Sequence, residues 1–305
     1  YEVQADWNIF AGKDFSWNVG GNISYNMNKV LKLPENGNYK NRMNGTLFAD
    51  DYYAGIGGIA EGERLYSVIG YKVSHILDND KAASEAMYDE RAAGYDPVTQ
   101  TYEKGRKIAG DYEWVDKDGS GTITAKDQFV LGYLVPTTTG GFNTTVKIRD
   151  FEIYASFDYA LGHVIYDRQI SLVNSGAQSG YLNPTKDVLN YWSVPGDAAK
   201  TRYARFDVED GSDNGQWNHY RTSDENTYKG DYLSFRELKV SYNFPRTILN
   251  KTQIKAAQVY FSGQNIYCFS QYPGYMTEYS SASRNLSDGN YPQPRIWTLG
   301  LNLTF

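Results

Sequence analysis

The sequence of 305 residues is poor in several residue types that carry chemistry in other proteins. It contains one cysteine, Cys268, and three histidines. A single cysteine excludes an internal disulfide framework and a cysteine-based zinc site. The net charge is −6 and no cluster of basic residues occurs, which argues against a nucleic-acid partner. No apolar run reaches the roughly 18 residues that a transmembrane helix needs.

Arrangements typical of catalysis are lacking as well. His75, His163 and His219 stand outside any recognised nucleophile or metal context. No glycine-rich segment continues into the Lys-Ser/Thr ending of a phosphate loop. We therefore expect that the protein is not an enzyme.

A strict alternation of residue types is present at the end of the chain. The stretch RIWTLGLNLTF (295–305) places Trp297, Leu299, Leu301, Leu303 and Phe305 at every second position. The residues between them are small or polar. A period of two predicts a β-strand whose two faces meet different surroundings.

The same alternation predicts further strands over 3–9, 15–28, 142–148, 151–161, 237–244 and 257–264. A composition of 28 tyrosines and 29 glycines agrees with a β-rich, turn-rich chain. Two architectures fit these strands alone, a soluble β-sandwich and a transmembrane barrel.

The connections between the predicted strands distinguish these architectures. They alternate between short ones, such as residues 12–14 and 149–150, and long ones over about 33–137, 167–229 and 268–294. In an antiparallel meander, every second connection lies at the same end of the sheet. Short turns at one end and long loops at the other are typical of outer-membrane barrels. The sequence therefore favours an all-β, transmembrane antiparallel barrel with long extracellular loops.

Several motifs resemble one family. GDYLSFRELKVSYNFP (230–245), VYFSGQNIY (259–267), YPGY (272–275) and YPQPRIWTLGLNLTF (291–305) are similar to the C-terminal end of SusC/RagA TonB-dependent transporters of the outer membrane. VDKDGSGTITAKDQFVLGYLVP (115–136), GGFNTT (140–145) and FSWNVGGNISYNMNKVLKL (15–33) resemble the barrel region before that end. Their order and spacing also fit.

The resemblance implies a barrel of about 22 strands with a plugged lumen, of which residues 1–305 would form the C-terminal part with roughly seven strands. The chain begins without methionine and already inside a strand, so we expect the plug domain, the TonB-contacting segment and the other strands to precede Tyr1 in a longer protein. The family works in the outer membrane of Bacteroidetes with a SusD-like surface lipoprotein as a lid. It imports oligosaccharides or peptides with energy from TonB, and often forms a dimer of transporter–lipoprotein pairs.

The resemblance also gives the last strand a role. Barrels of this kind typically finish on an aromatic residue that the assembly machinery reads. Here the assembly signal would consist of Leu299, Leu301, Leu303 and Phe305. The alternative is that a terminal phenylalanine simply packs.

The segment DKDGSGTITAKD (116–127) has the layout of a twelve-residue calcium loop. Oxygen ligands would come from Asp116, Asp118, Ser120, the Thr122 carbonyl and Asp127. Gly121 lies at the sharp turn, and Ile123 at the position of the apolar anchor.

The loop departs from the usual pattern at two positions. Ser120 replaces the usual acid and Asp127 replaces the usual glutamate, which lowers the expected affinity for the ion. We expect Ca²⁺, with Mg²⁺ as the alternative ion. The competing interpretation is a metal-free polar turn held by Asx hydrogen bonds.

The predicted long loop 167–229 is rich in aromatic residues, with arginines and aspartates among them. Aromatic faces beside carboxylates and amides suit sugar recognition. Trp192, Trp217 and Tyr220 are the candidate substrate-binding residues, although most aromatic residues of this loop would pack within it or against the lid. The lumen-facing set would be Glu152, Asp158, Glu237 and Lys239.

A secreted, calcium-stabilised β-sandwich that binds glycans is the alternative function.

Overall fold

The computed structural model describes residues 1–43, 58–96, 98–99, 101–167, 170, 183–206, 219, 221–250, 252–274 and 293–305. Seven long strands form one sheet in the order β1-β2-β11-β12-β15-β16-β17, and every neighbouring pair is antiparallel. They are β1 (Glu2–Ala11), β2 (Phe15–Tyr25), β11 (Thr138–Ile148), β12 (Phe151–Leu161), β15 (Tyr232–Asn243), β16 (Ala256–Ser270) and β17 (Ile296–Thr304). All seven predicted strands are therefore confirmed.

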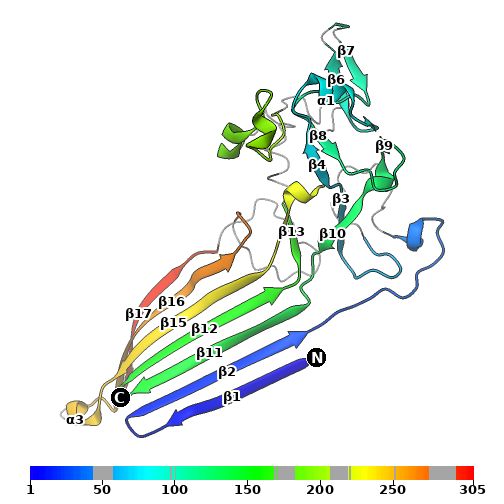
Figure 1. The fold of residues 1–305 in the computed structure, drawn as a ribbon. Helices are drawn as coiled ribbons and strands as arrows, with labels where there is room; N and C mark the ends of the chain where they lie inside the picture. The colour runs from blue at the N-terminus through cyan, green and yellow to red at the C-terminus, as the bar shows by residue number, and fades with distance from the viewer. Residues whose placement is uncertain are drawn as a thin grey trace.

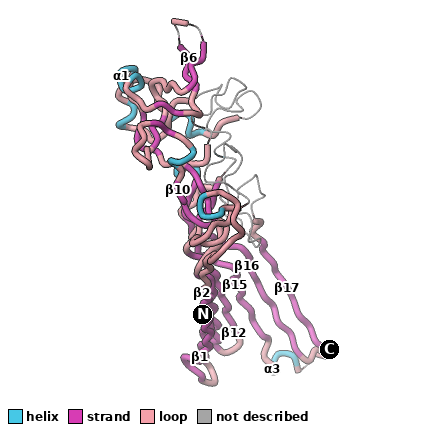
Figure 2. Tube along the Cα trace, turned by 90° about the vertical axis from the view of Figure 1, so that its right-hand side faces the viewer, coloured by secondary structure: helices cyan, strands magenta, loops and turns pink. Residues whose placement is uncertain are grey.

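The two ends of this sheet differ, as the connection lengths predicted. Figure 1 shows the turns β1–β2, β11–β12 and β15–β16 at one end of the sheet, and the rest of the chain rising from the other end. The β15–β16 turn holds the short helix α3 (Arg246–Leu249). Figure 2 shows that the strands do not lie in one plane, with β17 set apart from β1. The sheet is open between β1 and β17, as a part of a larger barrel would be.

One face of the sheet is apolar and uncovered. Trp7 is 70% exposed and Leu299 is 77% exposed, and their apolar neighbours on the other strands are exposed as well. Phe157 stacks between Phe142 and Phe235, with ring centroids 4.7 and 4.6 Å apart, so aromatic rings cross three strands on this face. A soluble sheet would bury such a face, whereas a barrel presents it to lipid. The fold is thus the transmembrane β-barrel type, and the sandwich expectation was wrong.

Four strands extend beyond their predicted bounds, namely β1, β11, β15 and β16, and β2 ends at Tyr25 rather than at 28. The structure begins β15 at Tyr232 rather than 237, because the register shifts between Phe235 and Glu237. Arg236 is the extra residue of β15 against β12, whereas against β16 it lies opposite two residues, Asn265 and Ile266. This irregularity inverts the alternation on which the prediction depended. The partner strand β16 continues to Ser270, past Asn265, whose φ of 53° marks the same irregularity.

The described parts of the first two long connections fold into a module of small elements at the other end of the sheet, drawn above it in Figure 1. Its two-stranded sheets pair β3 with β10, β4 with β8, β5 with β9, β6 with β7 and β13 with β14. The strands are β3 (Ser67–Gly70), β4 (Val73–Ile76), β5 (Tyr88–Asp89), β6 (Ala93–Asp96), β7 (Thr101–Lys104), β8 (Tyr112–Trp114), β9 (Thr122–Ile123), β10 (Phe129–Tyr133), β13 (Val164–Tyr166) and β14 (Thr227–Lys229). The helices are α1 (Asp80–Ser84) and the 3-10 turns Tyr39–Asn41, Ala125–Asp127, Lys186–Asn190, Asp197–Ala199 and Asp224–Asn226.

The module has a core of its own, which the sequence did not reveal. Trp114 is fully buried beside Tyr71 and Tyr112, with ring centroids 5.8 and 5.5 Å away. Ala204 and Trp192 of the second long connection pack into the same cluster. The first two long connections therefore form one folded unit. Among the described residues, no helix is long and apolar enough to cross a membrane.

A buried ion pair joins these two connections. The Arg221 guanidinium donates to both carboxylate oxygens of Asp89, at 3.3 and 3.0 Å, and both side chains are about fully buried. The Arg221 Cζ also lies 5.0 Å from the Tyr71 ring centroid and 4.7 Å from that of Trp114. Aromatic faces and a forked carboxylate replace the water that this cation loses.

A second buried carboxylate, that of Asp111, also joins the first long connection to the second. Asp111 accepts from Arg205 Nε at 2.6 Å and lies 3.1 Å from His219 Nε2. Burial alone would raise the pKa of Asp111, but the nearby Arg205 guanidinium and the His219 hydrogen bond outweigh it and lower this pKa to about 2. Asp111 is therefore ionised at neutral pH.

We expect Arg221→Met to destabilise the module by about 3–5 kcal/mol, because it leaves the Asp89 charge buried without its forked partner. Hydrogen exchange of residues 58–136 measures the effect. Lys81→Met is the control, because the Lys81–Glu85 pair is exposed and 3.9 Å long, and should change protection little. Unchanged protection in Arg221→Met would show that the pair does not hold the two connections together.

Candidate functional site

The three acids of the predicted calcium loop lie together. One carboxylate oxygen from each of Asp116, Asp118 and Asp127 falls within 4.8 Å of the others. Asp127 is fully buried, while Asp118 is exposed. Ser120 Oγ lies 3.0 Å from the Thr122 carbonyl oxygen, so both remaining predicted ligands are also near each other. The structure thus brings the three predicted acids together, and the five-residue ligand set stays a prediction.

The backbone holds these acids in place. Gly119 N and Gly121 N donate to the two oxygens of Asp116 at 2.7 and 2.8 Å, and both glycines have a positive φ, which favours glycine. Asp127 accepts from Lys117 N at 2.9 Å and from Thr124 N at 2.7 Å. The hydrogen bond from Gly121 N is the main reason why the pKa of Asp116 is lowered, against the opposing effect of burial. Asp116 therefore stays ionised at neutral pH.

The loop is fixed to the module through its apolar position. Ile123 is fully buried in the cluster around Trp114, and the short strand β9 pairs with β5. No helices of EF-hand length flank the loop in the described residues. The donor set consists of hard oxygens and fits Ca²⁺ or Mg²⁺. The same hydrogen bonds would also hold a metal-free Asx turn, so the ion remains a prediction.

The predicted substrate residues have different positions. Trp192 is partly buried, packs against the module core, and donates from Nε1 to Asp78 Oδ1 at 3.1 Å. This hydrogen bond, after the one from Ala198 N, lowers the pKa of Asp78. Trp217 and Tyr220 lie outside the described residues. The geometry of Trp192 is that of a packing residue, and its contact with substrate stays a prediction.

A pocket of about 550 Å³ opens beside this core. Tyr191 and Tyr203 from the segment before residue 206, Tyr228 on β14 and Tyr112 on β8 line it, together with the Arg202–Glu225 ion pair. We call it the tyrosine pocket. The sequence placed three of these tyrosines in one long loop. It gave no signal for Tyr112, which comes from the other loop and approaches only through the shared core.

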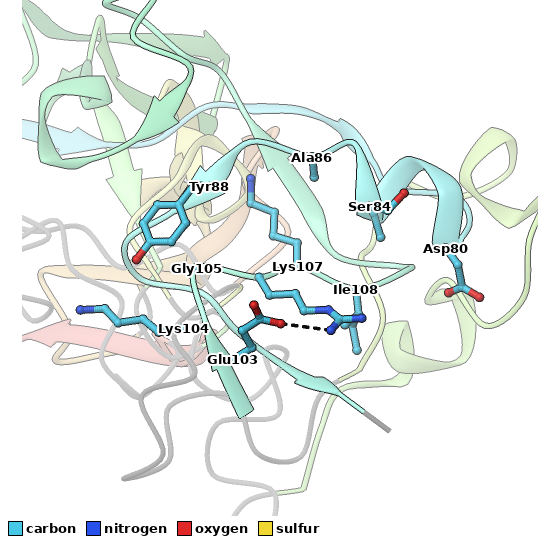
Figure 3. Close-up of a pocket in the computed structure, with 11 residues that line it drawn as sticks. Asp80, Ser84, Ala86, Tyr88, Glu103, Lys104, Gly105, Lys107 and Ile108 are labelled. Carbon is cyan, nitrogen blue, oxygen red and sulfur yellow. Dashed lines mark hydrogen bonds and ion pairs between the residues drawn. The ribbon is translucent and has the colours of Figure 1, made fainter. Parts of the chain in front are cut away.

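A second, wider pocket of about 860 Å³ lies at the far tip of the module. Figure 3 shows that Asp80 and Ser84 of α1 border one side of it, and Glu103 and Lys104 of β7 the other. Arg106 pairs with Glu103 at 3.2 Å, and Lys107 is buried against Glu113 at 2.5 Å. One ion pair, Arg106–Glu103, therefore lies within the lining, and Lys107 is paired with Glu113 behind it.

The polar face of the sheet carries paired charges. Arg236 forks onto Asp158 at 2.7 and 2.8 Å and donates to Asn265 Oδ1 at 2.9 Å. Arg236 and Asn265 lie opposite each other at the register shift between β15 and β16, which allows this hydrogen bond. Of the other predicted lumen residues, Glu152 pairs with Lys147 at 3.0 Å, and the Lys239 ammonium lies 4.9 Å from the Tyr260 ring centroid. Glu237 lies opposite Ser156 and Gln264.

The residues of the predicted assembly signal lie on the apolar face. Leu299, Leu301, Leu303 and Phe305 are all exposed at the edge strand β17. Lys255 Nζ donates to the Phe305 carbonyl at 3.0 Å. The structure shows their position, and their role in assembly stays a prediction.

The chain is similar over its whole length to known receptors, although no family model matches it. It is 27% identical over 323 residues to the TonB-dependent receptor P3 of Formosa agariphila, covering 100% of this chain and 28% of that protein. It is 25% identical over 333 residues to the TonB-dependent receptor P39 of the same organism, covering 100% and 30%. Against the TonB-dependent receptor SusC of Bacteroides thetaiotaomicron it is 23% identical over 296 residues, covering 96% and 25%.

Solved structures show the same fold. The structure of the RagAB peptide transporter superposes with a TM-score of 0.70 at 20% sequence identity, covering 100% of this chain and 29% of that one. The chain thus spans under a third of the length of the proteins it matches. The resemblance that the motifs predicted is confirmed, and the chain is a relative of the SusC/RagA TonB-dependent transporters with part of their barrel fold.

Proposed function

We propose that the chain forms part of the barrel and the outer loops of a SusC-like importer in the bacterial outer membrane. The exposed apolar face of the seven-stranded sheet carries this proposal. A face with Trp7 and Leu299 more than two-thirds exposed is stable only against lipid. The opposite face holds paired charges such as Arg236 and Asp158, which suit a polar lumen.

The similarity to SusC and to RagAB supports the rest of the proposal. A SusD-like lipoprotein would close the barrel from outside, and TonB would supply energy through a part of the receptor that precedes this sequence. The cargo would be an oligosaccharide or a peptide, moved without chemical change. The relatives come from Formosa agariphila and Bacteroides thetaiotaomicron. The proposal further includes a Bacteroidetes host and a dimer of transporter–lipoprotein pairs.

Purification of the full-length receptor from outer membranes tests this function. We expect a plug domain in the same polypeptide, a co-purifying lipoprotein, and a shift in gel mobility on heating, which folded barrels show. Deletion of the receptor gene should abolish growth on one nutrient class while leaving growth on monosaccharides intact. A receptor recovered from the soluble fraction, without heat-modifiable mobility, would contradict the proposal.

We also propose that the loop 116–127 binds Ca²⁺. Titration calorimetry on chelator-treated full-length receptor should show binding at millimolar Ca²⁺ or below. Asp118→Asn should weaken it by about tenfold, because affinity follows the number of charged ligands. Asp118 is exposed and accepts from Ser120 N at 3.0 Å, a bond that an amide oxygen can also accept, so this change should leave the fold intact. Asp197→Asn, in an acidic turn elsewhere, is the control. No heat with millimolar Ca²⁺ or Mg²⁺ would leave the metal-free turn as the explanation.

The terminal residue gives a prediction about assembly. Phe305→Ala should lower the amount of heat-modifiable receptor in the outer membrane severalfold if the assembly machinery reads the end of β17. Phe269→Ala is the matched control, because Phe269 is an exposed phenylalanine at the far end of β16. Equal losses in the two variants would show that Phe305 only packs.

A further inference from the structure

The short turns of the sheet carry an uneven set of charges. Among the described residues, the turns β1–β2, β11–β12 and β15–β16 hold four exposed cations, namely Lys13, Arg149, Arg246 and Lys255. The same turns hold two carboxylates, those of Asp14 and Asp150. Within the described part of the chain, none of the four cations takes part in an ion pair. A chain with a net charge of −6 thus keeps a surplus of positive charge at this end of the sheet.

Main-chain hydrogen bonds place these cations in one row. Arg149 N donates to the Asp14 carbonyl at 2.8 Å, and Asn243 N donates to the Asp150 carbonyl at 2.9 Å, so each turn is attached to the next. Lys255 N donates to the Thr304 carbonyl of β17 at 2.7 Å. Figure 1 shows the three turns at the same end of the sheet. We call the row formed by Lys13, Arg149, Arg246 and Lys255 the basic rim.

A belt of aromatic residues lies beside the basic rim on the apolar face of the sheet. Phe10 and Phe15 contact each other, with ring centroids 5.4 Å apart. Tyr242 lies between Phe151 and Phe244, at 4.7 and 5.1 Å between centroids. The aromatic residues of outer-membrane barrels gather at the two interfaces between hydrocarbon and water. The belt therefore corresponds to one of these interfaces, and the basic rim to the level of the lipid headgroups just beyond it.

The spacing along the chain joins the basic rim to this belt. Lys255, from the turn before β16, donates from Nζ to the Phe305 carbonyl at the end of β17, at 3.0 Å. Lysine and arginine stems can lie along apolar surface while the charged end reaches polar groups at the interface. The other three cations are each two residues away from a belt residue, in the pairs Lys13 with Phe15, Arg149 with Phe151, and Arg246 with Phe244.

Charge and position together identify the ligand. The short turns of outer-membrane barrels face the periplasm, so the basic rim would meet the inner leaflet of the membrane. Lysine and arginine near a membrane surface are attracted by anionic lipids, whereas a zwitterionic headgroup offers no net charge. We propose that the basic rim binds phospholipids whose headgroups carry a net negative charge. This inference rests on the proposed importer, because it requires the apolar face to lie in a membrane, and it adds a preference for one class of headgroup.

The test is native mass spectrometry of the full-length receptor in detergent, with equal amounts of dioleoyl phosphatidylglycerol and dioleoyl phosphatidylcholine as probes. We expect the receptor to retain phosphatidylglycerol about tenfold more than phosphatidylcholine, since each nearby cation favours the anionic lipid. This preference should fall as the salt concentration rises, because exposed charges are screened. The variant that combines Lys13→Gln, Arg149→Gln, Arg246→Gln and Lys255→Gln should retain the two lipids about equally. The salt dependence is measured on the unaltered receptor, so this part of the test needs no variant.

The control removes the same amount of positive charge from exposed lysines of the module, by Lys81→Gln, Lys104→Gln, Lys186→Gln and Lys200→Gln, and should keep the preference. Heat-modifiable gel mobility checks that both variants contain a folded barrel. The proposal would be overturned by equal retention of both lipids in the unaltered receptor, by a preference that salt or the rim variant leaves unchanged, or by an equal loss in the control. Outer-membrane location and lipoprotein co-purification test the importer separately, so loss of the lipid preference leaves that function standing.

Discussion

The exposed apolar face of the seven-stranded sheet is the constraint on which the rest of the structure depends. Every second residue of each strand must face lipid, so the intervening residues alone are available for the lumen. Backbone groups in the hydrocarbon region must all pair with neighbouring strands, which requires long antiparallel ladders such as the eleven paired residues of β11 and β12. Short turns on one side keep that ladder in register. The long connections are thereby restricted to the other end.

At that end, the chain folds into a module that has no large apolar core. Buried ion pairs connect its parts. Arg221 lies between Tyr71 and Trp114 and forks onto Asp89, while Asp111 joins Arg205 and His219. Each pair links a residue of the first long connection to one of the second. Such pairs add little net stability over apolar contacts, but a wrong pairing would leave a charge buried alone. They therefore favour one mutual arrangement of the two connections.

The acidic loop and the tyrosine pocket share this module core. Ile123 extends from the acidic loop into the cluster around Trp114, and Ala204 reaches the same cluster from the segment that carries Tyr203. An ion that stiffened the loop would thus stiffen one side of the core against which the tyrosine pocket is built. Arg236 and Asp158 on the polar face of the sheet lie apart from this unit, in the barrel itself.

The sequence by itself determined the strands, their order and the faces of the sheet. The alternation of apolar and polar residues is a local property of each strand, and contact with lipid on one face makes this alternation regular. The sequence also determined the acidic loop, whose ligands are within twelve residues of one another. Only the tertiary structure decided that two long connections form one module, that Trp192 packs inside it, and that Tyr112 meets Tyr203. Those contacts join residues about ninety positions apart, and nothing in the local pattern around either residue specifies the partner. The sequence did not reveal the bulge at Arg236 for a related reason. An extra residue breaks the alternation, and it can be recognised as extra only from the pairing with the neighbouring strands.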